Sequence, residues 1–212
     1  VALVVVLCGQ GYAYQHTIQE YKGPETCLNC HFEAASQMFG APHYQWRGPT
    51  PNVTNIEGYA SKGDRGFNTY CGAENSSRRF TCSTCHVGNG GAPKPTLSRE
   101  QLNNIDCLTC HQERYRRQAA PPYEAVSFTG FDGVTRTWNL PVEDQDGSFS
   151  FMPTQSAMRI PVLEAVSMVQ LPTRASCLSC HAYAAGSDCG KRGDLSSFTV
   201  SPPLWAEVHM SP

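Results

Sequence analysis

Hydrophobic and polar positions along the chain predict only short helices. Residues 32–39 (Phe-Glu-Ala-Ala-Ser-Gln-Met-Phe) are typical of a short helix, and Gly40 provides a stop signal directly after it. Ser98 opens a sequence that resembles a capping box, which predicts a second short helix running into Cys107. Residues 161–171 predict a third. No stretch has the length or pattern of a large apolar core.

Two short runs predict strands in the middle of the chain. Residues 126–129 (Val-Ser-Phe-Thr) and 135–138 (Thr-Arg-Thr-Trp) carry β-branched and aromatic side chains. Gly130 and the pair Asp132-Gly133 lie between them and are favoured in tight turns. The pattern therefore predicts a small β-hairpin.

The first eight residues, Val-Ala-Leu-Val-Val-Val-Leu-Cys, form an apolar run that is too short to span a bilayer as a helix. One interpretation is the end of a secretory signal, with a small-residue site near Ala13. The other is a retained β-strand that pairs with another subunit. We treat residues 1–13 as a separate N-terminal segment and residues 14–212 as a single domain.

Composition favours a loop-rich chain. Its 212 residues include 18 glycines and 15 prolines, which limit regular secondary structure. Charged residues make up 16% of the chain and the net charge is −2. No basic patch indicates nucleic-acid binding.

The sequence also contains four copies of the motif Cys-x-x-Cys-His. They are Cys27 and Cys30 with His31, Cys82 and Cys85 with His86, Cys107 and Cys110 with His111, and Cys177 and Cys180 with His181. This pattern is the attachment signature of a c-type haem. The two thiols add to the porphyrin vinyl groups, and the adjacent histidine reaches the iron. The chain is therefore predicted to bind four covalently attached haem c groups.

Four large, flat, apolar groups can replace a side-chain core. The predicted fold class is thus a mostly irregular, loop-rich multihaem cytochrome with few short helices and small β-hairpins, in which haems form the core. A zinc site built from the second and third motifs has nearly suitable spacing, but it leaves the trailing histidines unexplained. A thioredoxin-like role lacks the surrounding βαβ pattern.

The histidine count limits the iron chemistry. Four haems with two histidine ligands each need eight histidines, and the chain has seven. Beyond the four motif histidines, the remaining ones are His16, His43 and His209, which we assign as distal ligands. One haem is therefore a histidine short.

Three explanations of this shortage stay open. A methionine completes the iron, or the iron is five-coordinate, or a further terminal piece of the chain carries another histidine. We favour methionine, which raises a haem's potential relative to histidine ligation. The available residues are Met38, Met152, Met158, Met168 and Met210.

Three of the eleven cysteines lie outside the motifs: Cys8, Cys71 and Cys189. Haem attachment of this type takes place outside the cytoplasm, where disulfides persist. We expect a Cys71–Cys189 disulfide, and two free buried thiols are the alternative. In the same compartment Asn52 and Asn75 match the N-glycosylation pattern.

The residues around the motifs resemble multihaem c-type cytochromes. The resemblance rests on passages 67–71, 82–88, 104–111 and 172–177 and covers roughly residues 16–210. The haem count at this length looks like the tetrahaem extracellular cytochrome filaments, or cytochrome nanowires. That resemblance implies a secreted, head-to-tail homopolymer with stacked haems, in which one haem takes its distal histidine from the adjacent subunit. His16 is the first candidate for that ligand and His209 the second.

Three functions follow as hypotheses. The first is an extracellular filament that conducts electrons along its haems to redox proteins or extracellular acceptors, without enzyme activity. The second is a soluble periplasmic tetrahaem carrier. The third is a multihaem reductase subunit with one five-coordinate haem, against which the scarcity of Lys, Arg and His beyond the ligands weighs.

Overall fold

The structure is a computed structural model that describes most of the chain. The described residues are 16–45, 47–49, 52, 54, 59–61, 88–89, 93–142, 150–182, 188 and 196–205. Several predicted features lie outside them. These are residues 1–13, the whole second motif from Cys82 to His86, His209, Met210, Asn75 and the cysteines Cys8, Cys71 and Cys189.

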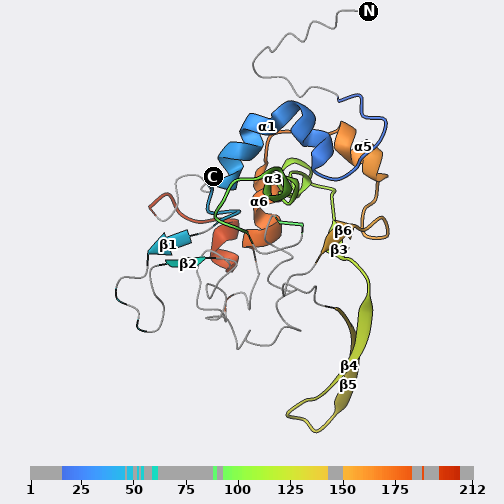
Figure 1. Ribbon diagram of the computed structural model, residues 1–212. Coiled ribbons are helices and arrows are strands. Elements are labelled where there is room, and N and C mark those ends of the chain that lie inside the picture. Colours follow the sequence, from blue (N-terminus) through green and yellow to red (C-terminus); the bar gives the residue numbers. More distant parts are fainter. Residues whose placement is uncertain are drawn as a thin grey trace, which may run out of the picture.

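The helices are short, as the pattern predicts. They are α1 (Glu25–Phe39), α3 (Arg99–Asn103), α4 (Leu108–His111), α5 (Val162–Ser167), α6 (Arg174–His181) and the 3₁₀ helix η3 (Ser197–Val200). α1 lies across the top of the molecule in Figure 1, with α3 and α6 beneath it. α1 packs on α3, and α4 packs on α6.

The strands pair as three separate two-stranded antiparallel sheets. They are β1 (Arg47–Pro49) with β2 (Tyr59–Ser61), β3 (Arg117–Ala119) with β6 (Phe151–Pro153), and β4 (Tyr123–Thr129) with β5 (Thr135–Pro141). The β4–β5 hairpin is the longest and projects away from the helices (Figure 1). It contains both predicted strand runs, which confirms the hairpin.

Local chemistry accounts for the hairpin. Gly133 has a φ of +73°, a left-handed conformation that favours glycine at this turn. Along the ribbon, hydroxyl groups pair across the strands: Ser127 with Thr137 at 2.8 Å and Thr129 with Thr135 at 2.9 Å. Such cross-strand pairs fix the register of the two strands.

The helix start predicted at Ser98 is confirmed, whereas the helix predicted at 32–39 begins earlier in the structure. The helix predicted at 32–39 is the second half of α1, which begins earlier and includes the first motif. The Ser98 side chain accepts a hydrogen bond from the Gln101 N–H at 3.2 Å and begins α3. α3 ends before Cys107 because the Asn104 carbonyl accepts the Asn89 N–H at 2.7 Å, outside the helix.

α5 is also shorter than the predicted 161–171. It ends at Ser167, and the Gln170 N–H donates to the His111 carbonyl at 3.0 Å rather than to a helical partner. A tertiary hydrogen bond thus replaces the last turn, which sequence periodicity alone does not reveal.

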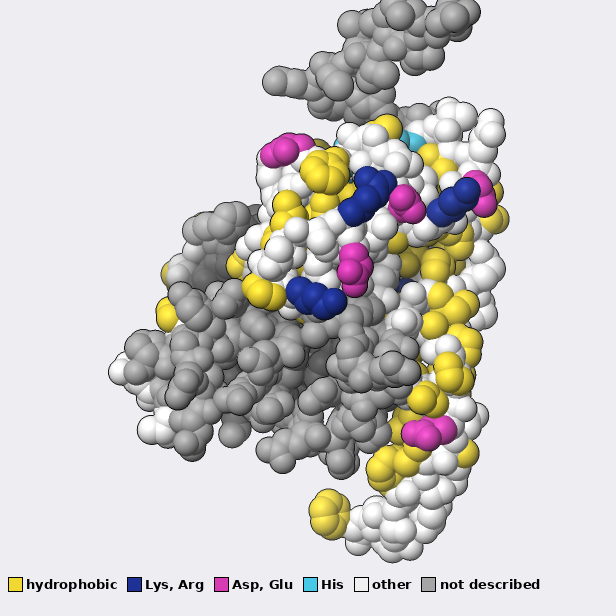
Figure 2. Space-filling view, viewed as in Figure 1, with side chains coloured by type: hydrophobic (Ala, Val, Ile, Leu, Met, Phe, Trp, Pro, Cys, Tyr) yellow, Lys and Arg dark blue, Asp and Glu magenta, His cyan; other side chains and the backbone are white. Residues whose placement is uncertain are grey.

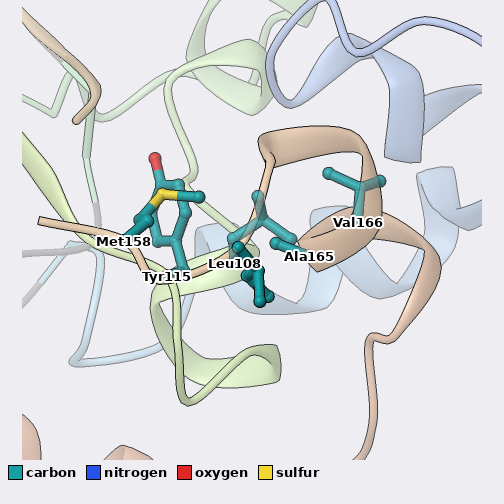
Figure 3. Close-up of a cluster of buried hydrophobic side chains, with 6 residues drawn as sticks. Leu108, Tyr115, Met158, Ala165 and Val166 are labelled. Carbon is teal, nitrogen blue, oxygen red and sulfur yellow. The ribbon is translucent and has the colours of Figure 1, made fainter. Parts of the chain in front are cut away.

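Within the described residues, buried side chains form three small clusters rather than one large core. The first lies between α1 and α3: Leu28, Ala35, Tyr44, Leu102 and Ile105. The second joins α4 to α5: Leu108, Tyr115, Met158, Ile160, Ala165 and Val166. Figure 3 shows the Met158 sulfur beside the Tyr115 ring in this second cluster. The third is the pair Ala119 and Phe151.

Candidate haem-binding sites

The three described motifs lie on helices. Cys27 and Cys30 are on α1, Cys110 is on α4, and Cys177 and Cys180 are on α6. Residues three apart on a helix lie on the same face, so the two thiols of a motif point to one side. The six cysteines of these motifs are all free thiols, as attachment to a porphyrin requires.

A leucine anchors two of these motifs in the protein. Leu28 and Leu108 each follow the first cysteine and are 2% and 0% exposed. Leu28 packs between α1 and α3, and Leu108 packs between α4 and α5. This side chain lies about 100° around the helix from the cysteine before it, so the leucine and that thiol face different directions. Cys110 of the third motif packs against the first cluster, not against the one that holds Leu108.

The first motif histidine leaves the helical path. His31 has φ −115° and ψ 32°, a break inside α1. The ring of His16, from the segment before α1, faces it at 6.0 Å between ring centres, with the ring planes inclined by 58°. The His16 Nδ1 is buried and has no hydrogen-bond partner.

A second histidine pair has nearly the same geometry. His43, in the loop after α1, lies opposite His181 at the end of α6, with ring centres 6.2 Å apart and planes inclined by 69°. An imidazole nitrogen binds a transition metal at about 2 Å, so two rings on opposite sides of one metal have centres roughly 6 Å apart. Both pairs fit that separation.

These pairs bear on the histidine assignments made above. Each joins one motif histidine to one of the three histidines outside the motifs. His16 faces His31 of its own chain. Its role as a ligand for a neighbouring subunit stays a prediction. His16 precedes α1 in the chain and His31 lies inside it, so residues 17–24 return the His16 ring to its own motif.

His111 in the third motif is oriented by a backbone group. Its Nδ1 lies 2.8 Å from the Gln170 carbonyl oxygen. A carbonyl only accepts, so this contact keeps the proton on Nδ1 and leaves the Nε2 lone pair for a metal. Gln112 holds the same region: its side-chain amide donates to the Ala165 carbonyl at 2.8 Å and to the Met168 carbonyl at 3.2 Å.

The three described motifs lie next to one another. A hydrogen bond between the thiols of Cys27 and Cys107 lowers the pKa of Cys27 and raises that of Cys107. Burial raises the pKa of Cys110, as does its proximity to Cys180 and Cys177. The third motif therefore borders both the first and the fourth.

A buried ion pair adjoins the third motif. Asp106 directly precedes Cys107, and its Oδ2 lies 3.2 Å from Nη1 of Arg117. Burial raises the pKa of Asp106, and the Arg117 guanidinium opposes that shift. The sequence did not predict this pair: Asp106 precedes the motif, but nothing in the sequence identifies Arg117 as its partner.

The methionines proposed as ligands differ in burial. Met158 is buried in the cluster with Leu108, and Met38 is partly buried against the cluster at α1. Met152 and Met168 are 40% and 48% exposed. Asn52, one of the two possible glycosylation sites, lies in an exposed turn.

Two further features are absent from the described residues. No three His, Cys, Asp or Glu side chains there gather into a metal site of their own. Within the same ranges, no helix has the length and apolar character needed to cross a membrane.

Comparison with known proteins gives one relationship. No protein-family model matches the chain, and no solved structure does. A protein of Archaeoglobus fulgidus, described as uncharacterised, is 30% identical over 221 aligned residues, which cover 90% of this chain and 69% of the relative. The chain therefore belongs to the same family as this archaeal protein.

Proposed function

We propose that the chain is a secreted tetrahaem c-type cytochrome that polymerises head to tail and conducts electrons along its haems. The observation that carries the proposal is the pairing of motif histidines with histidines outside the motifs. His16 with His31 and His43 with His181 both have the ring separation of two ligands on one metal.

When bound, haem iron supplies one-electron oxidation and reduction, and bis-histidine ligation favours the low-spin state suited to electron transfer. The chain's own residues hold the motif helices in place and orient the motif histidines. Leu28 and Leu108 fix two motif helices in their clusters, and the Gln170 carbonyl holds the proton of His111 on Nδ1. No catalytic group is part of this proposal.

The proximity of the motifs supports conduction. Cys27 contacts Cys107, and Cys110 lies near Cys177 and Cys180. Because each thiol attaches to the edge of its porphyrin, neighbouring attachment points bring neighbouring porphyrin edges together. Short gaps between redox centres are what electron transfer through a protein needs.

Exposed aromatic side chains support self-association. Phe131 and Trp138 are exposed on the β4–β5 hairpin, and Phe198 and Trp205 are exposed near η3, with ring centres 6.2 Å apart. Figure 2 shows hydrophobic side chains along the outer edge of the molecule, leading down to the hairpin. Two different apolar surfaces on one chain suit a heterologous contact, which gives an open filament when it does not close.

The test is expression of the whole chain in a host with the c-type maturation machinery. We expect a mass increase of four haems per chain and filaments in electron micrographs of the purified protein. A chain without covalent haem would overturn the proposal entirely. Discrete particles with four haems would instead identify a soluble carrier, and a high-spin iron that binds added small ligands would identify a reductase subunit.

Self-association has its own test. Trp205→Ser removes a large apolar side chain that is 84% exposed, so it should reduce polymerisation and leave haem attachment unchanged. The matched control is Leu171→Ser, which removes an apolar side chain that is 81% exposed and belongs to neither of the two apolar surfaces. Unchanged filament length in both variants would place the contact elsewhere.

A further inference from the structure

The ion pair of Asp106 and Arg117 is the most deeply buried charged contact among the described residues. The Asp106 side chain is 0% exposed and that of Arg117 is 5%. The side chains of the other described ion pairs, such as Asp132 with Arg136, are between about half and three-quarters exposed. A buried pair gains little net stability over apolar side chains of similar size, so its presence calls for a further explanation.

Arg117 contacts the chain just after the second motif and just before the third. Its Nη1 donates to the Gly88 carbonyl at 3.0 Å and lies 3.3 Å from Oδ1 of Asn89, in addition to its contact with Asp106. Gly88 lies two residues after His86 of the second motif, and Asp106 lies one residue before Cys107 of the third.

Neighbouring groups fix the guanidinium in place. Its central carbon lies 4.9 Å from the centre of the Phe151 ring, a cation–π contact. The backbones of Gly88 and Ile105 also pair in an antiparallel bridge. The exit of one motif and the entry of the next are thus joined by both backbone and side-chain contacts.

Resting on the proposed function, we propose that Asp106 and Arg117 form a positioning pair for the third haem site. The pair ties Gly88 and Asn89, which follow the second motif in the chain, to the start of the third motif. It also places two opposite charges, in a poorly solvated environment, beside the attachment point at Cys107. Charges in such an environment act strongly on a neighbouring redox centre, and here they balance each other.

Removing one charge of the pair and removing both charges should have different effects on the midpoint potential of the third haem. Asp106→Asn keeps the shape of the side chain but leaves the Arg117 cation uncompensated, and arginine stays protonated. A buried cation favours the reduced iron, so the midpoint potential of the third haem should shift upward. The double variant Asp106→Asn with Arg117→Leu removes both charges and should bring that potential back towards the wild-type value.

The experiment uses the whole haem-loaded protein. Paramagnetic NMR during a redox titration resolves each haem, and the third is assigned by loss of its signals in Cys107→Ala with Cys110→Ala. Asp132→Asn is the matched control, because Asp132 pairs with Arg136 at 2.6 Å on the exposed hairpin. It should leave all four potentials unchanged.

Arg117→Lys covers the case in which the other variants assemble poorly. It keeps the charge but loses the planar fork, so the thermal midpoint should fall while the potential of the third haem stays near wild type. The inference is overturned if Asp106→Asn leaves the midpoint potential of the third haem as unchanged as Asp132→Asn does. It is also overturned if Arg117→Lys shifts that potential as much as Asp106→Asn does.

Failure of the proposed function would give a different experimental result from failure of this inference. In that case mass analysis of the wild-type protein finds no haem on Cys107 and Cys110, whereas failure of the inference leaves four haems attached with insensitive potentials.

Discussion

Replacing His16 by alanine tests the histidine pairing most directly. The ring of His16 faces His31 at 6.0 Å, and its Nδ1 is buried without a hydrogen-bond partner. In the proposed tetrahaem protein, removing the ring takes one ligand from one of four irons. About one quarter of the low-spin signal should therefore disappear, because strong ligands on both sides are needed for that state.

Covalent attachment should survive this change, since Cys27 and Cys30 still carry the thiols. Mass spectrometry should find four haems per chain. Electron paramagnetic resonance of the oxidised protein should show the lost low-spin fraction, and imidazole added to the solution should restore it. Filaments should persist, because the structure places His16 against its own chain.

The control is Gln19→Ala, an exposed position in the same segment, which should leave the spectrum unchanged. An unaltered low-spin signal in His16→Ala would refute the pairing. Loss of filaments together with the low-spin fraction would show instead that His16 ligates iron in an adjacent subunit.

Three further predictions concern stability. Leu28→Ala empties a fully packed position and should lower the free energy of unfolding by about 2–5 kcal/mol, whereas Leu171→Ala, at a position 81% exposed, should change it little. Gln112→Ala removes the side-chain donor to the Ala165 and Met168 carbonyls, of which the Ala165 carbonyl keeps the Met168 N–H, and should cost about 1–3 kcal/mol, measured by chemical denaturation. Burial raises the pKa of Asp106, so the folded chain holds its proton to higher pH than the unfolded chain. Stability should then fall as the pH rises from about 4 through the folded-state pKa, and Asp106→Asn should flatten this decline in thermal midpoints.

Local signals in the sequence predicted the local structure. The Ser98 hydroxyl competes well for the free N–H groups of a helix start, and the structure has that cap. The turn at Gly133 requires a backbone conformation that glycine adopts readily, and the hairpin forms there. Both features depend on residues a few positions apart, which a linear pattern contains.

Tertiary hydrogen bonds determine the structural features that the sequence pattern did not predict. α5 is short because Gln170 donates to His111, which lies 59 positions earlier in the chain. The partner of Asp106 is likewise a side chain selected by the fold. The sequence identified His16 and His43 as the only spare histidines apart from His209, but their pairing with His31 and His181 depends on how the loops return.

The two histidine pairs limit which haem can lack a distal histidine. If His16 and His43 serve the first and fourth motifs, His209 remains for either His86 or His111, and the second or third haem lacks a histidine. The third motif borders both the first and the fourth, so its potential matters for any route between them. Methionine ligation there would raise the potential in the middle of the route and hold electrons, because leaving that site would be uphill in both directions. The same ligation at the second haem would leave the route from the first haem through the third to the fourth free of such a trap. A haem-resolved titration that places the highest potential on the second haem would therefore fit conduction, whereas the highest potential on the third would favour storage of an electron at that site.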